Sequence, residues 1–315
     1  MTAPAVISNI AYGWETSYGV VSTSINKAFG SGVKVTNLNR KNNMEQVWDA
    51  GLRNAAVIAP KRYEGTASVE WVLANPWFFQ ALLSAPTTSG SGPYTHTFAE
   101  ADTVPSFSLK SQINSTTAEV ANLLGAKMGA CTISSAVNEL VRCKADIPYA
   151  NEAFSTTTSA RVAESETLFT FAQATLELPT GSTLAMVQNF DFTINNNPEI
   201  VYGQGSRVGQ EATVKNRAYT GNISMALQQS GDLLTKFFGG STGPATTVAE
   251  AATMKFTFTN GLTSTNLRSI VATFTGIQLD EDSIPQDPTQ NIMEDCPFMA
   301  RSLSVVATNN TSAAP

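Results

Sequence analysis

Few residue types in the sequence stand at spacings that could support catalysis or transition-metal binding. The one histidine, His96, lies in an alternating segment at residues 94–98, and the chain offers it no second histidine and no paired cysteine. A catalytic dyad or a zinc site would need such a partner. We therefore expect His96 to be a solvated or hydrogen-bonded strand residue that faces away from its aromatic neighbours.

The three cysteines, Cys131, Cys143 and Cys296, are widely spaced, odd in number and without a C-x-x-C pair. This spacing favours neither a disulfide framework nor a metal site, so we expect three reduced thiols in the core. The sequence also lacks nucleophile-elbow, P-loop, zincin and dinucleotide-binding motifs. We predict a protein that is not an enzyme, needs no cofactor and binds no catalytic metal.

One acidic run stands out near the C-terminus. Asp280, Glu281 and Asp282 are followed by Asp287, Glu294 and Asp295, which makes six carboxylates in sixteen residues without a lysine or arginine. An EF-hand loop needs ligands at alternate positions, a central glycine and a terminal glutamate, and the run lacks this pattern. We therefore favour a solvated acidic loop over a calcium site. Such a face would also repel another polyanion.

The composition limits the partners that the chain can grip. Charged residues make up only 14% and apolar residues 42% of its 315 residues, so much of the surface must consist of uncharged polar side chains. The net charge of −6 and the pI near 4.9 argue against a surface that binds nucleic acid by neutralising phosphates. We also expect neither a secretory signal nor a membrane-spanning segment.

Alternation with a period of two dominates the chain and predicts a mainly β protein. β-branched or aromatic residues alternate with small or polar ones at residues 66–72, 106–109, 131–134, 190–194, 255–258 and 270–274. Two segments instead carry bulky apolar residues at helical spacing. We expect short helices at residues 75–84 and 231–238, which begin with Asn-Pro and Gly-Asp.

The two halves of the chain resemble each other, which predicts a tandem duplication. A pattern of seven residues recurs in order, first as Val47, Trp48, Gly51, Arg53, Tyr63, Gly65 and Ser68, and then as Val201, Tyr202, Gly205, Arg207, Tyr219, Gly221 and Ser224. We call these residues the repeat signature. The last three residues of each copy, from the tyrosine to the serine, align at an offset of 156. The same offset matches the two helical segments and aligns residues 95–98 approximately with 254–258.

This duplication suggests the following organisation. We expect an extended N-terminal arm at residues 1–32, a first unit at 33–150 and a linker at 151–166, where a Ser/Thr-rich stretch of low complexity resists packing. A second unit would occupy residues 167–307, and residues 308–315 would form a loose C-terminal tail.

The stretch at residues 47–69 and its second copy resemble the major tail tube protein family of long-tailed bacterial and archaeal viruses. Residues 12–19 resemble the N-terminal arm of that family, and residues 124–134 resemble its late strand pair. The similarity covers most of the chain. It implies a β-sandwich or barrel-like unit with a flanking helix, and an internally duplicated form of the family.

The resemblance further implies a structural virion protein of the viral tail, assembled in the host cytoplasm. Trimeric, pseudo-hexameric rings would stack into a tube through which double-stranded DNA passes into the host. Partners would be further copies of the chain, a tape measure protein, a tail terminator and DNA in transit that is not tightly bound. By the same likeness, residues 39–60 and 195–217 would be loops that contact the next ring.

Barrel geometry is consistent with this implication. With four strands a unit, six units make a 24-stranded barrel of roughly 48 Å backbone diameter, which leaves a bore of roughly 38 Å. A DNA rod of at least about 16 Å fits this bore, whereas a 12-stranded barrel would leave only roughly 14 Å. Low positive charge would keep the DNA mobile. Asp280, Glu281 and Asp282 are candidates for the bore or for the contact between rings.

A carbohydrate-binding or adhesive β-module is the alternative from a different functional class. It would need exposed aromatic residues in a groove, whereas we expect Trp71, Trp77, Phe78 and Phe79 to lie in the core. The tube of a contractile injection device is a closer alternative, but we would expect it to be shorter and unduplicated.

Overall fold

The computed structural model describes residues 8–113, 118–158, 160, 166–227, 232–240, 243–248, 251–263, 266–286 and 291–312. Strands account for 54% of the chain and helices for 5%, which confirms the predicted mainly β class. All six segments with a period of two coincide with strands, although Ser106 lies one residue before its strand. Among the described residues, no helix is both long and apolar enough to cross a bilayer.

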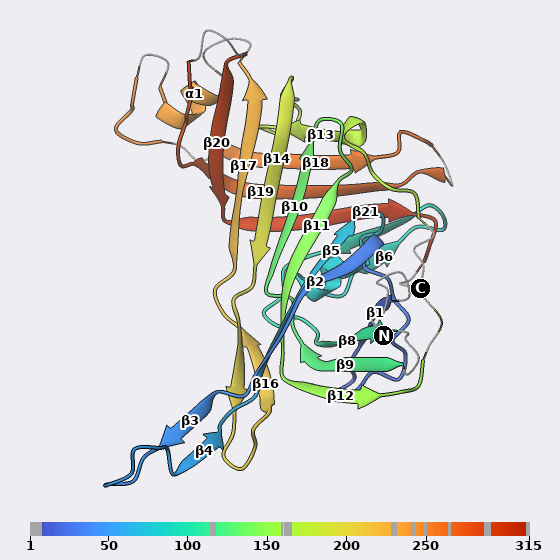
Figure 1. Cartoon of the computed structure of the whole chain (residues 1–315). Coiled ribbons are helices and arrows are strands. Elements are labelled where there is room, and N and C mark those ends of the chain that lie inside the picture. The colour runs from blue at the N-terminus through green and yellow to red at the C-terminus, as the bar shows by residue number, and fades with distance from the viewer. Residues whose placement is uncertain are drawn as a thin grey trace.

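One antiparallel sheet runs through both halves of the chain, and we call it the long sheet (Figure 1). Its order is β2 (Ser31–Lys41), β5 (Glu64–Val72), β11 (Arg142–Tyr149), β10 (Ala130–Ala136), β14 (Val187–Asn195), β17 (Ala218–Ala226) and β20 (Met293–Ala300). The first four strands come from the first half of the chain and the last three from the second. The halves therefore meet where β10 pairs with β14.

Two shorter sets of strands cross the long sheet at a steep angle (Figure 1). The first set is the four-stranded sheet β1 (Ser8–Trp14), β8 (Phe107–Ile113), β9 (Glu119–Ala126) and β12 (Asn151–Ser155). The second contains β13 (Ala174–Glu177), β18 (Ala251–Thr259), β19 (Ser269–Leu279), β21 (Ser302–Asn309), β7 (Tyr94–Phe98) and β6 (Thr87–Ser89). The end of β19 also pairs with β20, which joins this second set to the long sheet.

The core lies between the long sheet and these crossing strands. Along β10, Cys131 and Ile133 are fully buried while Thr132 and Ser134 between them remain partly exposed, so one face of the sheet packs on the core and the other is open. Aromatic rings fill the core in both halves, for example where the ring centroids of Phe192 and Phe256 lie 4.8 Å apart.

The aromatic residues expected in the core are buried. Trp71, Trp77, Phe78 and Phe79 are all at most 3% exposed. These four residues therefore offer no aromatic groove to a carbohydrate.

Two β-hairpins project from the same end of the long sheet (Figure 1). They are β3 (Met44–Val47) with β4 (Val57–Pro60), and β15 (Pro198–Tyr202) with β16 (Gly209–Val214). The family resemblance predicts loops at residues 39–60 and 195–217, and this prediction is wrong in detail. Pairing into hairpins satisfies the backbone N–H and C=O groups of these long segments away from the core.

The two helical segments differ from each other. An α-helix, α1 (Asp232–Phe238), lies where the sequence predicts one. The segment at residues 75–84 contains only the short 3₁₀ helix η2 (Trp77–Ala81), in which three consecutive aromatic residues are buried. An amphipathic α-helix would have turned one of these rings toward solvent. A second 3₁₀ helix, η3 (Phe171–Gln173), precedes β13.

Several expected boundaries differ from the observed strands. The predicted linker begins with β12, which pairs with β9, and the predicted C-terminal tail begins inside β21. The N-terminal arm contains β1, which pairs with β8. β7 pairs with β21, whereas residues 254–258 lie in β18 between β13 and β19, so these two segments do not correspond. Residues 1–7, 161–165 and 313–315 lie outside the described part of the chain.

Candidate functional site: the bases of the paired hairpins

The repeat signature residues gather at the two projecting hairpins and at the strands below them. Val47, Trp48, Gly51 and Arg53 lie in β3 and the turn after it, and Val201, Tyr202, Gly205 and Arg207 lie in β15 and the turn after it. The remaining signature residues lie just before β5 or in β5 and β17. The hairpin bases are therefore the candidate functional site.

Glycine has the same role in both hairpin turns. Gly51 has a φ of +87° and Gly205 a φ of +82°, and a Cβ atom at either position would meet no atom within 4 Å. Backbone conformation, rather than lack of space, therefore explains glycine at both positions.

The entry to each hairpin repeats the same asparagine contact. Asn43 and Asn197 both have a positive φ, 47° and 43°. The Nδ2 of Asn43 donates to the carbonyl of Arg62 (3.1 Å), and the Nδ2 of Asn197 donates to the carbonyl of Asn216 (2.8 Å). Each residue number in the second contact is 154 higher than in the first.

A backbone bond and an ion pair recur at the same offset. The Lys61 N–H donates to the carbonyl of Asn42 (3.1 Å), as the Lys215 N–H does to that of Asn196 (3.2 Å). Lys61 also pairs with Glu45 (2.7 Å), and Lys215 pairs with Glu199 (2.5 Å).

Further along the chain, equivalent bonds recur 151 residues apart. The Ala150 N–H donates to Leu124 (2.9 Å) and the Arg301 N–H to Thr275 (3.0 Å). Likewise, the Gly129 N–H donates to the Asp146 carbonyl (2.8 Å). The Asp280 N–H donates to the Pro297 carbonyl (2.9 Å). The two halves thus repeat their backbone contacts at two nearly equal offsets.

These contacts correct the second part of the sequence alignment. With an offset of 154 at the hairpins, Tyr63 corresponds to Arg217 rather than to Tyr219, so the alignment of Tyr63, Gly65 and Ser68 is two residues out of register. The number of residues between the asparagine and the carbonyl that it contacts is the same in both hairpins. The second hairpin therefore cannot contain the two extra residues that an offset of 156 requires.

The misaligned motif nevertheless has a common physical basis. A Cβ on Gly65 would lie 2.2 Å from the ring of Tyr149 on β11, and a Cβ on Gly221 would lie 2.6 Å from the ring of Phe298 on β20. Each glycine makes room for an aromatic ring on the neighbouring strand. Ser68 donates to Asp146 (2.7 Å) in the first half, and in the second half Ser224 and Asp295 are the partners.

The two hairpins are tied to each other at their bases. Arg207 donates from Nε to the Lys61 carbonyl and from Nη2 to Oδ1 of Asn42, both at 2.8 Å. The Tyr202 hydroxyl donates to the Tyr63 carbonyl (2.8 Å), and the Tyr63 N–H donates back to the carbonyl of Arg207 (2.7 Å). These bonds make the hairpins one projecting structure.

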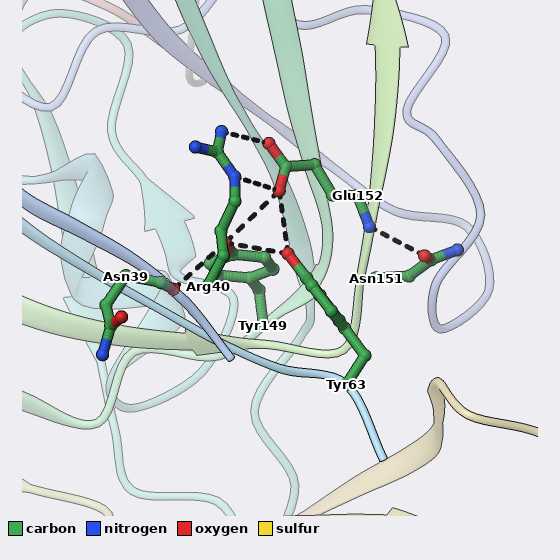
Figure 2. A network of polar contacts seen from close by, with 6 residues as sticks. All are labelled: Asn39, Arg40, Tyr63, Tyr149, Asn151 and Glu152. Carbon is green, nitrogen blue, oxygen red and sulfur yellow. Dashed lines mark hydrogen bonds and ion pairs between the residues drawn. The ribbon is translucent and has the colours of Figure 1, made fainter. Parts of the chain in front are cut away.

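A polar network anchors this structure to the body of the protein (Figure 2). The Arg40 guanidinium donates from Nε and Nη2 to the two carboxylate oxygens of Glu152 (2.6 and 2.5 Å), and the Tyr63 hydroxyl donates to Oε2 (2.8 Å). The hydroxyl of Tyr149 lies 3.3 Å from that of Tyr63.

The network is stable because its charges are matched. The Glu152 side chain is 4% exposed and that of Arg40 41% exposed. The hydrogen bond with Glu152 raises the pKa of Arg40, and burial raises the pKa of the Tyr63 phenol, so the arginine stays charged and the tyrosine neutral. A bidentate pair of this kind fixes both side chains in one geometry.

Large apolar side chains are exposed on the first hairpin. Trp48 is 56% and Leu52 57% exposed, and the other exposed apolar residues of the hairpin are Met44, Val47, Val57 and Ile58. Val201 is exposed on the second hairpin. Apolar surface of this extent on a projecting element is typical of a protein–protein contact.

His96 has a structural role. It is buried, with Nδ1 2.8 Å from the Thr88 hydroxyl and Nε2 3.1 Å from Oδ1 of Asn309. Its ring also lies edge-on to Trp77. The expected hydrogen bonding is confirmed, but the expected orientation is wrong, because a period of two places His96 on the same face as Phe98.

The cysteines are buried free thiols, as expected. Desolvation raises the pKa of Cys131, Cys143 and Cys296 above the ordinary value, which leaves the thiols protonated and unreactive. In the acidic run, side-chain ligand atoms of Asp282, Glu294 and Cys296 lie within 4.8 Å of one another. The Cys296 thiol donates a hydrogen bond to Oδ1 of Asp282 (3.6 Å).

The acidic run is more ordered than the solvated loop that we expected. Asp280 and Glu281 are exposed, but the segment lies along β20, with a bridge between Ser283 and Asp295. Residues 280–286 thus occupy the outer edge of the long sheet next to β20. Asp287 lies outside the described residues.

Comparison with protein families adds an independent observation. A family model described as phage tail tube protein matches residues 7–300, which is nearly the whole chain. None of the curated proteins searched matches the chain.

Proposed function

The chain belongs to the phage tail tube protein family, and from this premise we propose that three copies close a ring and that stacked rings form a channel for viral DNA. Proteins of this family are structural components of the virion tail, are not enzymes and polymerise. The proposal concerns how this particular chain builds the tube.

The recurring contacts support two tandem units in each chain. The asparagine contacts, the lysine–glutamate pairs and the backbone bonds recur in both halves at offsets of 154 and 151 residues. Unrelated segments would not repeat a side-chain contact, an ion pair and a positive-φ residue together. The short helices η2 and α1 would flank the two units.

The continuity of the long sheet carries the proposal of a closed ring. Two units already share one sheet through the pairing of β10 with β14. Seven strands and the edge segment at residues 280–286 give each chain about eight strand positions, so three chains provide about 24. By barrel geometry, 24 strands enclose a backbone diameter of roughly 48 Å.

The open face of the long sheet would line the bore, because the other face packs on the core. This face carries both signs of charge, including Lys34 bonded to Glu70 (2.7 Å), and also Lys144, Asp146 and Asp191. Mixed charge and a net charge of −6 a chain give DNA few uncompensated cations to bind. The cargo would therefore remain mobile. A tape measure protein and a tail terminator would be the neighbours of the tube.

The paired hairpins would form the contact between rings. They project beyond the end of the long sheet, expose apolar side chains at the tip and are held rigidly at the base (Figures 1 and 2). A contact between a hairpin of one copy and a different surface of the next copy is heterologous, and such contacts generate open filaments.

Substitution at the hairpin tip tests this role. Trp48→Asp with Leu52→Asp should abolish long tubes in negative-stain images and leave the fold and the ring-sized species, because both side chains are exposed. A matched control is Leu262→Asp, an exposed leucine that lies away from the hairpins. Tubes of normal length from the double variant would refute the stacking role of the hairpin.

A further inference from the structure

The long sheet ends in two open edges at opposite sides of the chain. One edge is β2, which pairs only with β5 among the described strands. The other is the acidic segment at residues 280–286, which contacts β20 through the bond from the N–H of Asp280 and the bridge at Ser283. Open edges expose backbone groups that can pair with a further strand.

The join between the two halves supplies a template for how such edges meet. There, β10 pairs with β14 in a register that places Ala130 opposite Asn195 and Thr132 opposite Thr193. The two threonine hydroxyls lie 2.7 Å apart. This is a strand pairing between a first-half edge and a second-half edge.

The recurring backbone bonds relate each open edge to one side of this template. The acidic segment corresponds to β10, because the N–H of Asp280 repeats the bond of the Gly129 N–H at an offset of 151. The end of β2 corresponds to the end of β14 at an offset of 154, as Asn43 and Asn197 indicate. Transferring the template therefore places Glu281 opposite Lys41.

We propose that the acidic segment of one copy pairs antiparallel with β2 of a second copy, with Glu281 opposite Lys41 and the flanking residues in the same register. The next pairs are Asp282 with Arg40, Ser283 with Asn39 and Ile284 with Leu38. This inference rests on the proposed ring and names the surfaces that close it.

The side chains opposite each other across the proposed join support this register. It brings two carboxylates opposite two basic side chains and one isoleucine opposite a leucine. Glu281 and Lys41 are both exposed in the single chain. Opposite charges directly across an antiparallel pair stabilise it, and a shift by one residue would turn every side chain of the segment to the other face of the sheet. The acidic run would then lie at the join between copies rather than between rings.

A disulfide tests the register directly. In the template, the Asn196 N–H donates to the Gly129 carbonyl, so the adjacent pair Ala130–Asn195 is the close, non-hydrogen-bonded kind. The equivalent pair should therefore lie within disulfide reach. In assembled full-length protein, Glu281→Cys with Lys41→Cys should give covalent dimers and trimers on a non-reducing gel. The native cysteines are buried and should not interfere.

The matched control is Glu281→Cys with Asn39→Cys, which is shifted by two residues and should cross-link at least about tenfold less. Equal or stronger cross-linking of this control would overturn the register. Absence of cross-linking in both variants, while rings still form, would overturn the pairing of these edges. Wild-type protein that forms neither rings nor tubes would instead refute the proposed function.

Charge reversal provides a second test that does not depend on oxidation. Glu281→Lys alone and Lys41→Glu alone should each raise the concentration needed for assembly by roughly tenfold at low salt, because like charges would then face each other. The double variant should restore assembly. Failure of the double variant to recover, with its fold intact by circular dichroism, would count against the proposed pair.

Discussion

At the scale of single residues, the polar side chains at the hairpin bases hold the hairpins in one orientation rather than catalyse a reaction. Arg40, Glu152 and Tyr63 come from three parts of the chain and meet where the hairpins leave the body (Figure 2). The sequence could not reveal this network, because Arg40 and Glu152 are 112 residues apart and neither belongs to a local motif. The burial of the cysteines, by contrast, could be predicted, because their spacing favours neither a disulfide framework nor a metal site.

Removal of the Glu152 charge should loosen this base. We expect Glu152→Gln to lower the free energy of unfolding by about 1.5–3 kcal/mol, the usual contribution of hydrogen bonds to a charged group. Thermal or denaturant unfolding measures it. The control is Glu45→Gln, whose ion pair with Lys61 is exposed on both sides, so its loss should cost clearly less stability than Glu152→Gln. Equal losses in the two variants would contradict an anchoring role for Glu152.

The close packing of Gly65 against a tyrosine ring predicts a steric cost for any larger residue at this position. In Gly65→Ala the added Cβ would lie 2.2 Å from the Tyr149 ring, which forces a shift in a packed sheet. We expect a loss of about 1–3 kcal/mol in stability. At Gly203 the nearest atom to an added Cβ is 3.5 Å away, so Gly203→Ala should change stability by less than about 0.5 kcal/mol. An unfolding midpoint for Gly65→Ala equal to that of the wild type would refute this.

At the scale of elements, sequence periodicity predicted the long strands and missed the short ones. The alternation at residues 66–72 and 190–194 marks β5 and β14, because each has one face on the core. β3 and β4 have almost no buried residues, so they carry no such pattern. The Ser/Thr-rich sequence beside β12 predicts a linker there, whereas β12 pairs with β9 and is a strand.

The pairing of β13 with β18 gives a prediction about pH. A hydrogen bond from Lys255 and the backbone N–H of Gly181 lower the pKa of Glu177. Because the pKa of Glu177 is lower in the folded than in the unfolded protein, its charge stabilises the fold at pH values above the unfolded pKa, about 4.3. This stabilisation is lost as the pH falls through the pKa of the folded state. Glu177→Gln should therefore lower the unfolding temperature at pH 7 and make little difference below about pH 3.

Thermal unfolding of both proteins across this pH range is the measurement. The expected cost at pH 7 is less than about 1 kcal/mol, since the ion pair is partly solvated. A difference that stays constant from pH 7 to pH 3 would mean that the charge of Glu177 does not contribute.

At the scale of the whole molecule, the sequence indicated a repeat but not its register. The similarity of Gly65 and Gly221 led to an offset of 156, whereas recurring asparagine side-chain bonds and backbone bonds at the hairpins support an offset of 154. At an offset of 154, the glycine–aromatic pair of the second half lies two residues beyond the position equivalent to Gly65. One sequence alone cannot distinguish such a displaced pair from an equivalent one. The resemblance to tail tube proteins did not depend on this detail, and the family match confirms it.

The central proposal is that chains of 33.4 kDa join through their sheets into closed, hollow rings. Electron microscopy of the purified full-length protein, with its mass measured in solution, tests this most directly. We expect hollow rods whose end views show six similar lobes around a bore wide enough for duplex DNA, and free rings with the mass of three chains. A monodisperse species with the mass of one chain under all assembly conditions, or solid filaments, would contradict it.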